Sequence, residues 1–124
     1  MDSEGLNSEF WVNGEPSDRL PAGDAVVAHG FGVFETLRTY GSIPFRLGAH
    51  LARLESSALA LGIPFDGRLV EQEWLALCAP DVSLRYTLTG SGARIAEVRR
   101  IDSTYVGVAR CVAPIEWSAS IGLP

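Results

Sequence analysis

The fold of this chain is decided by VFETLRTY, residues 33–40, together with the turn and the helix that follow it. Residues 33–40 are of types that favour a strand, and apolar and polar residues roughly alternate along them. Gly41 and Ser42 then provide a turn, and residues 43–46 (IPFR) return as a second strand. Pro44 indicates an edge or the end of a strand, so the segment predicts a hairpin.

Two helices are predicted after this hairpin. Leu and Ala recur at spacings of three and four from Leu47 to Leu61, which is the stripe of an amphipathic helix. Gly62 and Pro64 supply its stop signal. A second helix is predicted from Gly67 to Ala79, with apolar residues on one side and Pro80 just beyond its end.

Further strands are predicted on both sides of this central part. Phe10 to Val12 forms a short strand that ends in Asn13-Gly14, a strong hairpin signal because both residues tolerate positive φ. Ser83 to Thr89 alternates between apolar and polar residues. Strand character resumes at Thr104 to Val112, after a break and a polar stretch that contains Arg99 and Arg100.

The order of strands, helices and strands predicts an α+β fold, a largely antiparallel sheet with two helices on one face. We expect residues 1–8 to be a flexible tail because they contain little to bury, and residues 9–112 to form one domain. Residues 113–124 have no clear period and are interpreted as the start of a linker.

Composition excludes several classes of function. The chain has 124 residues and a formal net charge of −5, which is unsuited to binding nucleic acid. No apolar run approaches the roughly 20 residues that a membrane span needs, so a cytoplasmic protein without membrane contact is expected. Cys78 and Cys111 have no spacing typical of a metal site, and none is predicted. All 10 Lys and Arg residues are Arg, so no Schiff base to a lysine can form within the chain.

A longer pattern of residues runs through this part of the chain. It consists of Trp11 to Glu15, Asp24, His29-Gly30, Gly32 to Arg38, Gly41, Pro44 to Leu47, His50-Leu51, Arg53-Leu54 and Ser57-Ala58. The pattern resembles the N-terminal signature of the class-IV aminotransferases and aminodeoxychorismate lyases, which are pyridoxal-phosphate-dependent enzymes of fold type IV. The resemblance covers roughly residues 10 to 90 and implies the small N-terminal domain of such an enzyme.

The resemblance implies a role for three residues in particular. Arg53 matches an arginine that contacts the cofactor phosphate, for which a planar guanidinium is well suited. The alternative is a solvated residue on the polar side of a helix. Phe34 and Arg38 match positions on the substrate side of the cofactor. Phe34 is either an apolar pocket wall or a plain core aromatic, and Arg38 either binds a substrate carboxylate or pairs with Glu35 or another acidic neighbour.

Other positions match the family less closely. His29 stands where the family usually has a tyrosine that reaches the active site, so a substrate contact through an imidazole is expected instead. Arg85 matches a basic residue for the acid group of the substrate. Arg94 is a candidate to replace the charge of an Arg-Gly pair that this chain lacks. His50 is interpreted as a structural helix histidine.

The resemblance also implies that the lysine that binds pyridoxal 5'-phosphate belongs to a second, larger domain. We therefore expect this chain to supply a phosphate contact and part of a pocket for an amino-acid or aminodeoxychorismate-like molecule, and to be inactive alone. The alternative is a non-catalytic remnant that acts as an assembly or binding module through a dimer face. In either case its partner is a second copy or a lysine-bearing domain.

Overall fold

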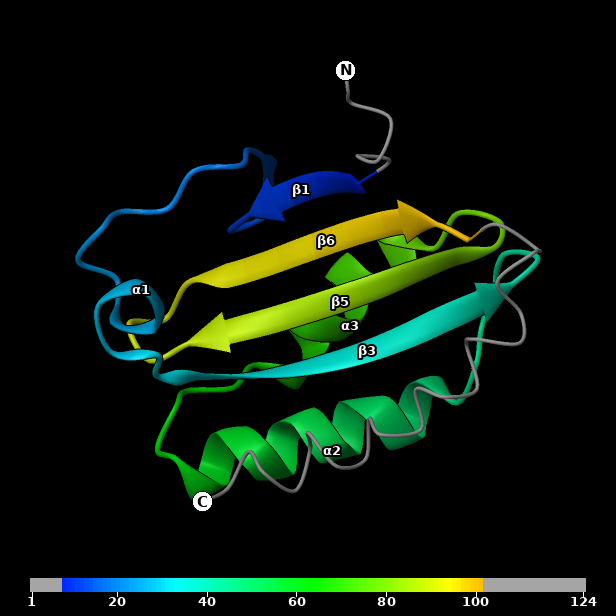
Figure 1. Cartoon of the computed structure of the whole chain (residues 1–124). Helices are drawn as coiled ribbons and strands as arrows, with labels where there is room; N and C mark the ends of the chain where they lie inside the picture. The colour runs from blue at the N-terminus through cyan, green and yellow to red at the C-terminus, as the bar shows by residue number, and fades with distance from the viewer. Residues whose placement is uncertain (1–7, 102–124) are drawn as a thin grey trace.

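The computed structural model describes residues 8–101, which form a sheet of six antiparallel strands with helices packed against it (Figure 1). The strand order is β2-β1-β6-β5-β3-β4. The predicted α+β fold class is confirmed. The elements along the chain are β1 (Ser8–Val12), β2 (Glu15–Pro16), α1 (Ala25–His29), β3 (Gly32–Tyr40), β4 (Ile43–Pro44), α2 (Leu47–Ala60), α3 (Gly67–Leu77), β5 (Val82–Thr89) and β6 (Arg94–Arg100).

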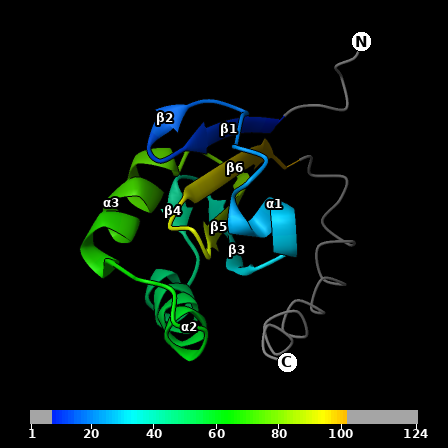
Figure 2. The same ribbon diagram turned by 90° about the vertical axis from the view of Figure 1, so that its left-hand side faces the viewer.

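The core lies between the sheet and one layer made by α2 and α3 (Figure 2). Strand β3 shows how alternation builds this layer, because Val33 and Leu37 are buried toward the helices while Phe34 and Tyr40 on the opposite side are exposed. The helices contribute their apolar stripes, and the largest core side chain is Trp74 of α3. Other fully buried core residues are Leu54, Ala58, Val70, Leu84 and Tyr86.

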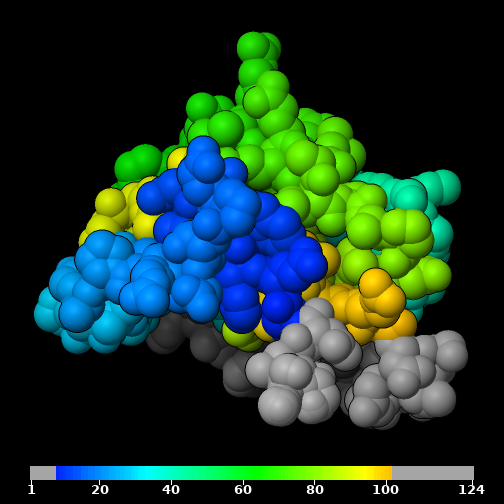
Figure 3. All heavy atoms as spheres, turned by 90° about the horizontal axis from the view of Figure 1, so that it is seen from above, coloured from blue at the N-terminus to red at the C-terminus, as the bar shows by residue number. Residues whose placement is uncertain are grey.

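The turns follow the sequence signals closely. Asn13 and Gly14 both have positive φ (54° and 86°) between β1 and β2, as the Asn-Gly prediction requires. The β1–β2 hairpin covers the β6 edge of the sheet (Figure 3). At the other edge β4 is two residues long and contains Pro44. Both outer strands thus end in a proline, which limits further strand pairing.

Strand β6 corrects the sequence analysis. A polar stretch that contains Arg99 and Arg100 was predicted before the next strand, but residues 94–100 form a strand that pairs with both β1 and β5. The alternation of this strand is hard to recognise because it has few apolar residues. Its arginines lie at the two ends of the strand, and Arg94 and Arg99 are bonded to carboxylates. Ala96 and Val98 face the core. The strand predicted at residues 104–112 and the linker at 113–124 lie outside the described residues, as do residues 1–7 of the predicted tail, whereas Ser8 already belongs to β1.

Helix α1 was also not predicted. The carboxylate of buried Asp24 caps it by accepting a hydrogen bond from the Val26 amide (2.9 Å), and also accepts one from the Thr89 hydroxyl (3.0 Å). The Ser91 hydroxyl accepts from the Ala25 amide (2.8 Å). These bonds hold the short helix against the turn between β5 and β6. The N-terminal end of α1 is therefore fixed at one corner of the sheet.

Candidate functional site

Three of the predicted site residues lie on the face of the sheet opposite α2 and α3, which we call the open face. On β3 this face carries Phe34 and Arg38, and on β5 it carries Arg85. Phe34 is 42% exposed, so it is not the core aromatic that was considered as an alternative. His29 is the exposed last residue of α1, at the corner where β5 meets β6.

Arg85 is placed above Phe34 by a cross-strand carboxylate. Its guanidinium carbon lies 5.7 Å from the centre of the Phe34 ring, within the range of a cation–π contact. Glu97 of β6 is the direct cross-strand neighbour of Arg85, with 3.4 Å between their charged atoms. Glu97 also bonds Arg99 (3.2 Å) and the Ser8 hydroxyl (2.9 Å). The Glu97 carboxylate therefore forms ion pairs with two arginines on this face.

Arg38 pairs with an acidic neighbour, Asp81, and not with Glu35. The distance from Arg38 Nη2 to Asp81 Oδ1 is 3.5 Å, and the guanidinium carbon lies 3.8 Å from the centre of the Tyr40 ring. Glu35 is excluded as a partner because residues 35 and 38 leave the strand on opposite faces. Arg38 thus lies at the end of the open face, near the β3–β4 turn.

Arg53 belongs to a different group, which we call the Glu35 cluster: Glu35, His50 and Arg53. The side chain of Glu35 is only 5% exposed, and its Oε2 accepts hydrogen bonds from Arg53 Nη2 (2.7 Å) and Arg53 Nε (2.9 Å). His50 Nδ1 lies 2.7 Å from the same oxygen. Arg53 itself is 41% exposed. The cluster therefore combines a buried anion with a cation that reaches the surface.

Local structure explains why these three residues meet. His50 and Arg53 are three residues apart on α2, so both side chains lie on one face of the helix. Glu35 takes part in the alternation of β3 and points toward that helix. No role was predicted for Glu35 from the sequence, and His50 was predicted to be a structural helix histidine. A charged residue among the buried positions of β3 was the available signal.

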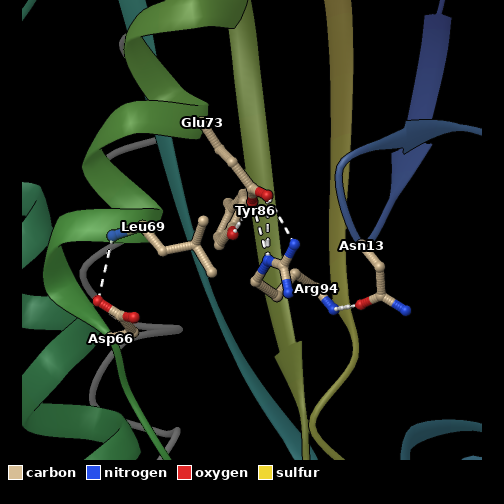
Figure 4. A network of polar contacts seen from close by, with 6 residues as sticks. All are labelled: Asn13, Asp66, Leu69, Glu73, Tyr86 and Arg94. Carbon is tan, nitrogen blue, oxygen red and sulfur yellow. Dashed lines mark hydrogen bonds and ion pairs between the residues drawn. The ribbon is translucent and has the colours of Figure 1, made fainter.

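A second polar cluster joins α3 to the sheet (Figure 4). Glu73 accepts a hydrogen bond from the Tyr86 hydroxyl (2.5 Å), and each of its carboxylate oxygens is bonded to Arg94, at 3.0 Å and 2.7 Å. Asn13 in the β1–β2 turn accepts from the Arg94 amide (2.9 Å). We call Glu73, Tyr86 and Arg94 the Glu73 cluster.

The Glu73 cluster shifts the titration of its members. Burial raises the pKa of Glu73, but the hydrogen bonds from Arg94 and Tyr86 and the charge of Arg94 outweigh it and hold that pKa below its ordinary value. Burial, followed by the bond to the Glu73 carboxylate, raises the pKa of Tyr86. Alternation along β6 directs Arg94 to the helix side of the sheet, so it does not lie on the open face.

A cavity of about 240 Å³ opens between α3, the loop before it and the end of β5. Its walls are mostly apolar, with Ile63, Phe65 and Leu69 on one side and Leu88 on the other. It lies on the helix-covered side and is therefore separate from Phe34, Arg38 and Arg85.

Within residues 8–101 no group of three or more His, Cys, Asp or Glu is arranged to hold a metal ion. In the same range no helix has the length and apolar character of a membrane span.

Comparisons with known proteins identify relatives of this chain. An aminodeoxychorismate lyase from Vibrio harveyi is 35% identical over 65 residues, which are 52% of this chain and 24% of that protein. The crystal structure of 4-amino-4-deoxychorismate lyase from Pseudomonas aeruginosa matches 74% of this chain and 39% of its own, at 31% identity and a TM-score of 0.65. A PLP-bound form of a hypothetical aminotransferase from Mycobacterium tuberculosis shares the fold at 24% identity and a TM-score of 0.57, over 82% of this chain and 43% of that one.

The chain thus spans about a quarter of the curated relative that it matches (24%) and 39% of the Pseudomonas aeruginosa lyase. The family model for amino-transferase class IV matches residues 32–120, which is more than half of the chain. That range includes both the Glu35 cluster and the open-face residues Phe34, Arg38 and Arg85. The chain belongs to the class-IV aminotransferase family.

Proposed function

We propose that this chain forms the N-terminal part of a pyridoxal-phosphate-dependent enzyme and that Arg53 contacts the cofactor phosphate. The observation that carries the proposal is the geometry of the Glu35 cluster, in which a buried carboxylate holds an arginine that is still 41% exposed. A solvated arginine on a helix surface would not require such an arrangement. The family match over residues 32–120 supports the same role.

The donor set fits a phosphate group. A guanidinium is planar, permanently charged and weakly hydrated, and it forms short, charge-assisted hydrogen bonds to phosphate oxygens. When bound, pyridoxal phosphate supplies an electron sink for carbanion chemistry. The residues of this chain would orient its phosphate and shape one wall of the pocket. They contain no lysine, so the amine that binds the cofactor would come from a second domain or a partner chain.

The open face is the proposed substrate side. It carries Arg38, Arg85 and Arg99, and the carboxylates bonded to them are those of Asp81 and Glu97, so positive charge is in excess here although the chain as a whole has a net charge of −5. A positive face next to the exposed ring of Phe34 suits an apolar or cyclic substrate with a carboxylate. His29, at the corner of this face, is proposed as a further substrate contact.

A lyase acting on an aminodeoxychorismate-like molecule is favoured over a transaminase. Both relatives above 30% identity that we describe are named as aminodeoxychorismate lyases.

A non-catalytic assembly module is the second candidate, and exposed aromatic and apolar side chains favour it. Tyr40, Ile43 and Phe45 at the β3–β4 hairpin are 54%, 72% and 49% exposed, so self-association into a dimer is expected for either function. A cytoplasmic location also stays a prediction.

Titration of the chain with pyridoxamine 5'-phosphate tests the role of Arg53. This probe has the phosphate but no aldehyde, so it cannot react with the N-terminal amine. We expect Arg53→Ala to weaken its binding by on the order of 1.5–3 kcal/mol, the value of a hydrogen bond to a charged group. The matched control is Arg68→Ala, which removes another exposed arginine from a helix. Equal affinities for Arg53→Ala and the unmodified chain would remove Arg53 from the phosphate role.

A further inference from the structure

We infer that Glu35 is a positioning residue, which is held in place by His50 and fixes the orientation of the Arg53 guanidinium toward a phosphate. The inference rests on the proposed function and assigns a role to Glu35 and His50, the other two members of the Glu35 cluster. Glu35 does not touch the phosphate in this assignment. It acts only through Arg53.

The first argument is the cost of burying Glu35. Its neighbours on the same face of β3 are Val33 and Leu37, which belong to the core. A carboxylate that is 5% exposed needs hydrogen-bond partners, since an unpaired buried charge strongly destabilises a fold. His50 and Arg53 place three nitrogens within 2.7 to 2.9 Å of its Oε2. An apolar residue would fill this position without needing hydrogen-bond partners. We therefore attribute the presence of a carboxylate here to its bonds with Arg53.

The second argument is the geometry at Arg53. Glu35 binds Nε and Nη2, the two nitrogens along one side of the guanidinium, so it fixes the plane of the group as well as its position. A long arginine side chain without such contacts samples many rotamers, and it must lose that freedom when a ligand binds. A guanidinium that is already oriented loses less conformational entropy when the phosphate binds, so this preorganisation increases the affinity.

The third argument concerns His50. Because Glu35 offers only acceptor oxygens when ionised, the proton between them lies on His50 Nδ1 in the neutral ring. The side chain of His50 is 14% exposed and lies three residues before Arg53 on α2. It therefore ties the Glu35 carboxylate to the same helix that carries Arg53. The three side chains form one unit.

Charge alone predicts the opposite effect, which makes the inference testable. A negative carboxylate beside a phosphate site repels the phosphate, so its removal would strengthen binding if charge were decisive. If orientation is decisive, its removal weakens binding. Glu35→Gln keeps the shape of the side chain and removes the charge. Glu73→Gln is the matched control because it makes the same change at another glutamate bonded to an arginine.

The experiment measures the affinity of the 124-residue chain for pyridoxamine 5'-phosphate and for pyridoxamine, which lacks the phosphate. For Glu35→Gln we expect about three- to ten-fold weaker binding of the phosphate probe, the loss that ordering one long side chain implies, and unchanged binding of pyridoxamine. Glu73→Gln should leave the ratio of the two affinities as it is. A merely structural role for Glu35 would change both probes together.

Unchanged or tighter binding of the phosphate probe by Glu35→Gln, while Arg53→Ala still weakens it, would overturn the inference and leave the proposed function intact. No effect of Arg53→Ala would overturn both. If circular dichroism shows that Glu35→Gln does not fold, His50 decides the question. His50→Leu removes the Nδ1 donor and should weaken the phosphate probe, whereas His50→Asn places an amide donor nearby and should restore binding. Equal affinities of these two variants would contradict the inference.

Discussion

The Glu35 cluster and the Glu73 cluster use the same chemistry with different results. Each joins a helix to the sheet through a glutamate bonded to an arginine at 2.7 Å. In the Glu73 cluster, Arg94 bonds both carboxylate oxygens and its side chain is 23% exposed. In the Glu35 cluster, Arg53 bonds Glu35 through one carboxylate oxygen of that glutamate, and its side chain is 41% exposed.

This difference shows what each pair can do. Arg94 extends from a central strand, and its backbone is also bonded to the β1–β2 turn, so the Glu73 cluster connects α3, β1, β5 and β6. Arg53 extends from a helix at the side of the sheet, where its guanidinium reaches the surface. A Glu–Arg pair in itself therefore does not indicate a binding site. The exposure of the cation distinguishes the structural pair from the candidate site.

The largest effect on stability is expected for Glu73→Ala. This change leaves the Tyr86 hydroxyl, on a residue that is 1% exposed, and the Arg94 guanidinium without their acceptor. We expect the free energy of unfolding to fall by about 2–3 kcal/mol, somewhat below the value for a fully buried pair because Arg94 is partly solvated. Urea unfolding measures it. A loss under about 0.5 kcal/mol would show that the Glu73 cluster stabilises the fold no more than a weak surface ion pair does. It would contradict the structural role that distinguishes this cluster from the Glu35 cluster.

A smaller effect is expected from acid. The pKa of Glu73 is lower in the folded chain than its ordinary value of 4.5, so the unfolded chain binds the proton more readily. The stability that this glutamate contributes is therefore fully present above that ordinary value and is lost as the pH falls through the lowered pKa. We expect the difference in unfolding free energy between the unmodified chain and Glu73→Gln to shrink over this range. A difference that stays constant from pH 6 to pH 3 would contradict the assignment.

The smallest effect is expected for Glu97→Gln on the open face. Both arginines bonded to Glu97 are more than half exposed (56% and 60%), so their ion pairs should contribute only about 0–1 kcal/mol to stability. Thermal unfolding at low and high salt measures the contribution, which salt should reduce further. If the loss equals that of Glu73→Ala, the open face shares the structural role that we assign to the Glu73 cluster alone.

The sequence by itself determined the fold class and most of its elements. Period-two alternation at residues 33–40 and 83–89, the three- and four-residue stripe of α2 and the Asn13-Gly14 turn are local signals, and local sterics and burial enforce them. Strand β6 and helix α1 were missed for the converse reason. Residues 94–100 have too few apolar side chains to show a period, and α1 with its cap Asp24 is held in place by Thr89 and Ser91, which are distant along the chain.

The candidate site divides in the same way. The sequence indicated Arg53, Phe34, Arg38 and Arg85 through the family pattern, and the structure places Phe34 and Arg38 on one face of β3. Only the tertiary structure decided which partners each arginine has. Glu35 lies 18 residues before Arg53 and Glu73 lies 21 before Arg94. Such pairs depend on how helices pack on the sheet, because side-chain bonds over these separations form only once the packed layers bring the residues within about 3 Å.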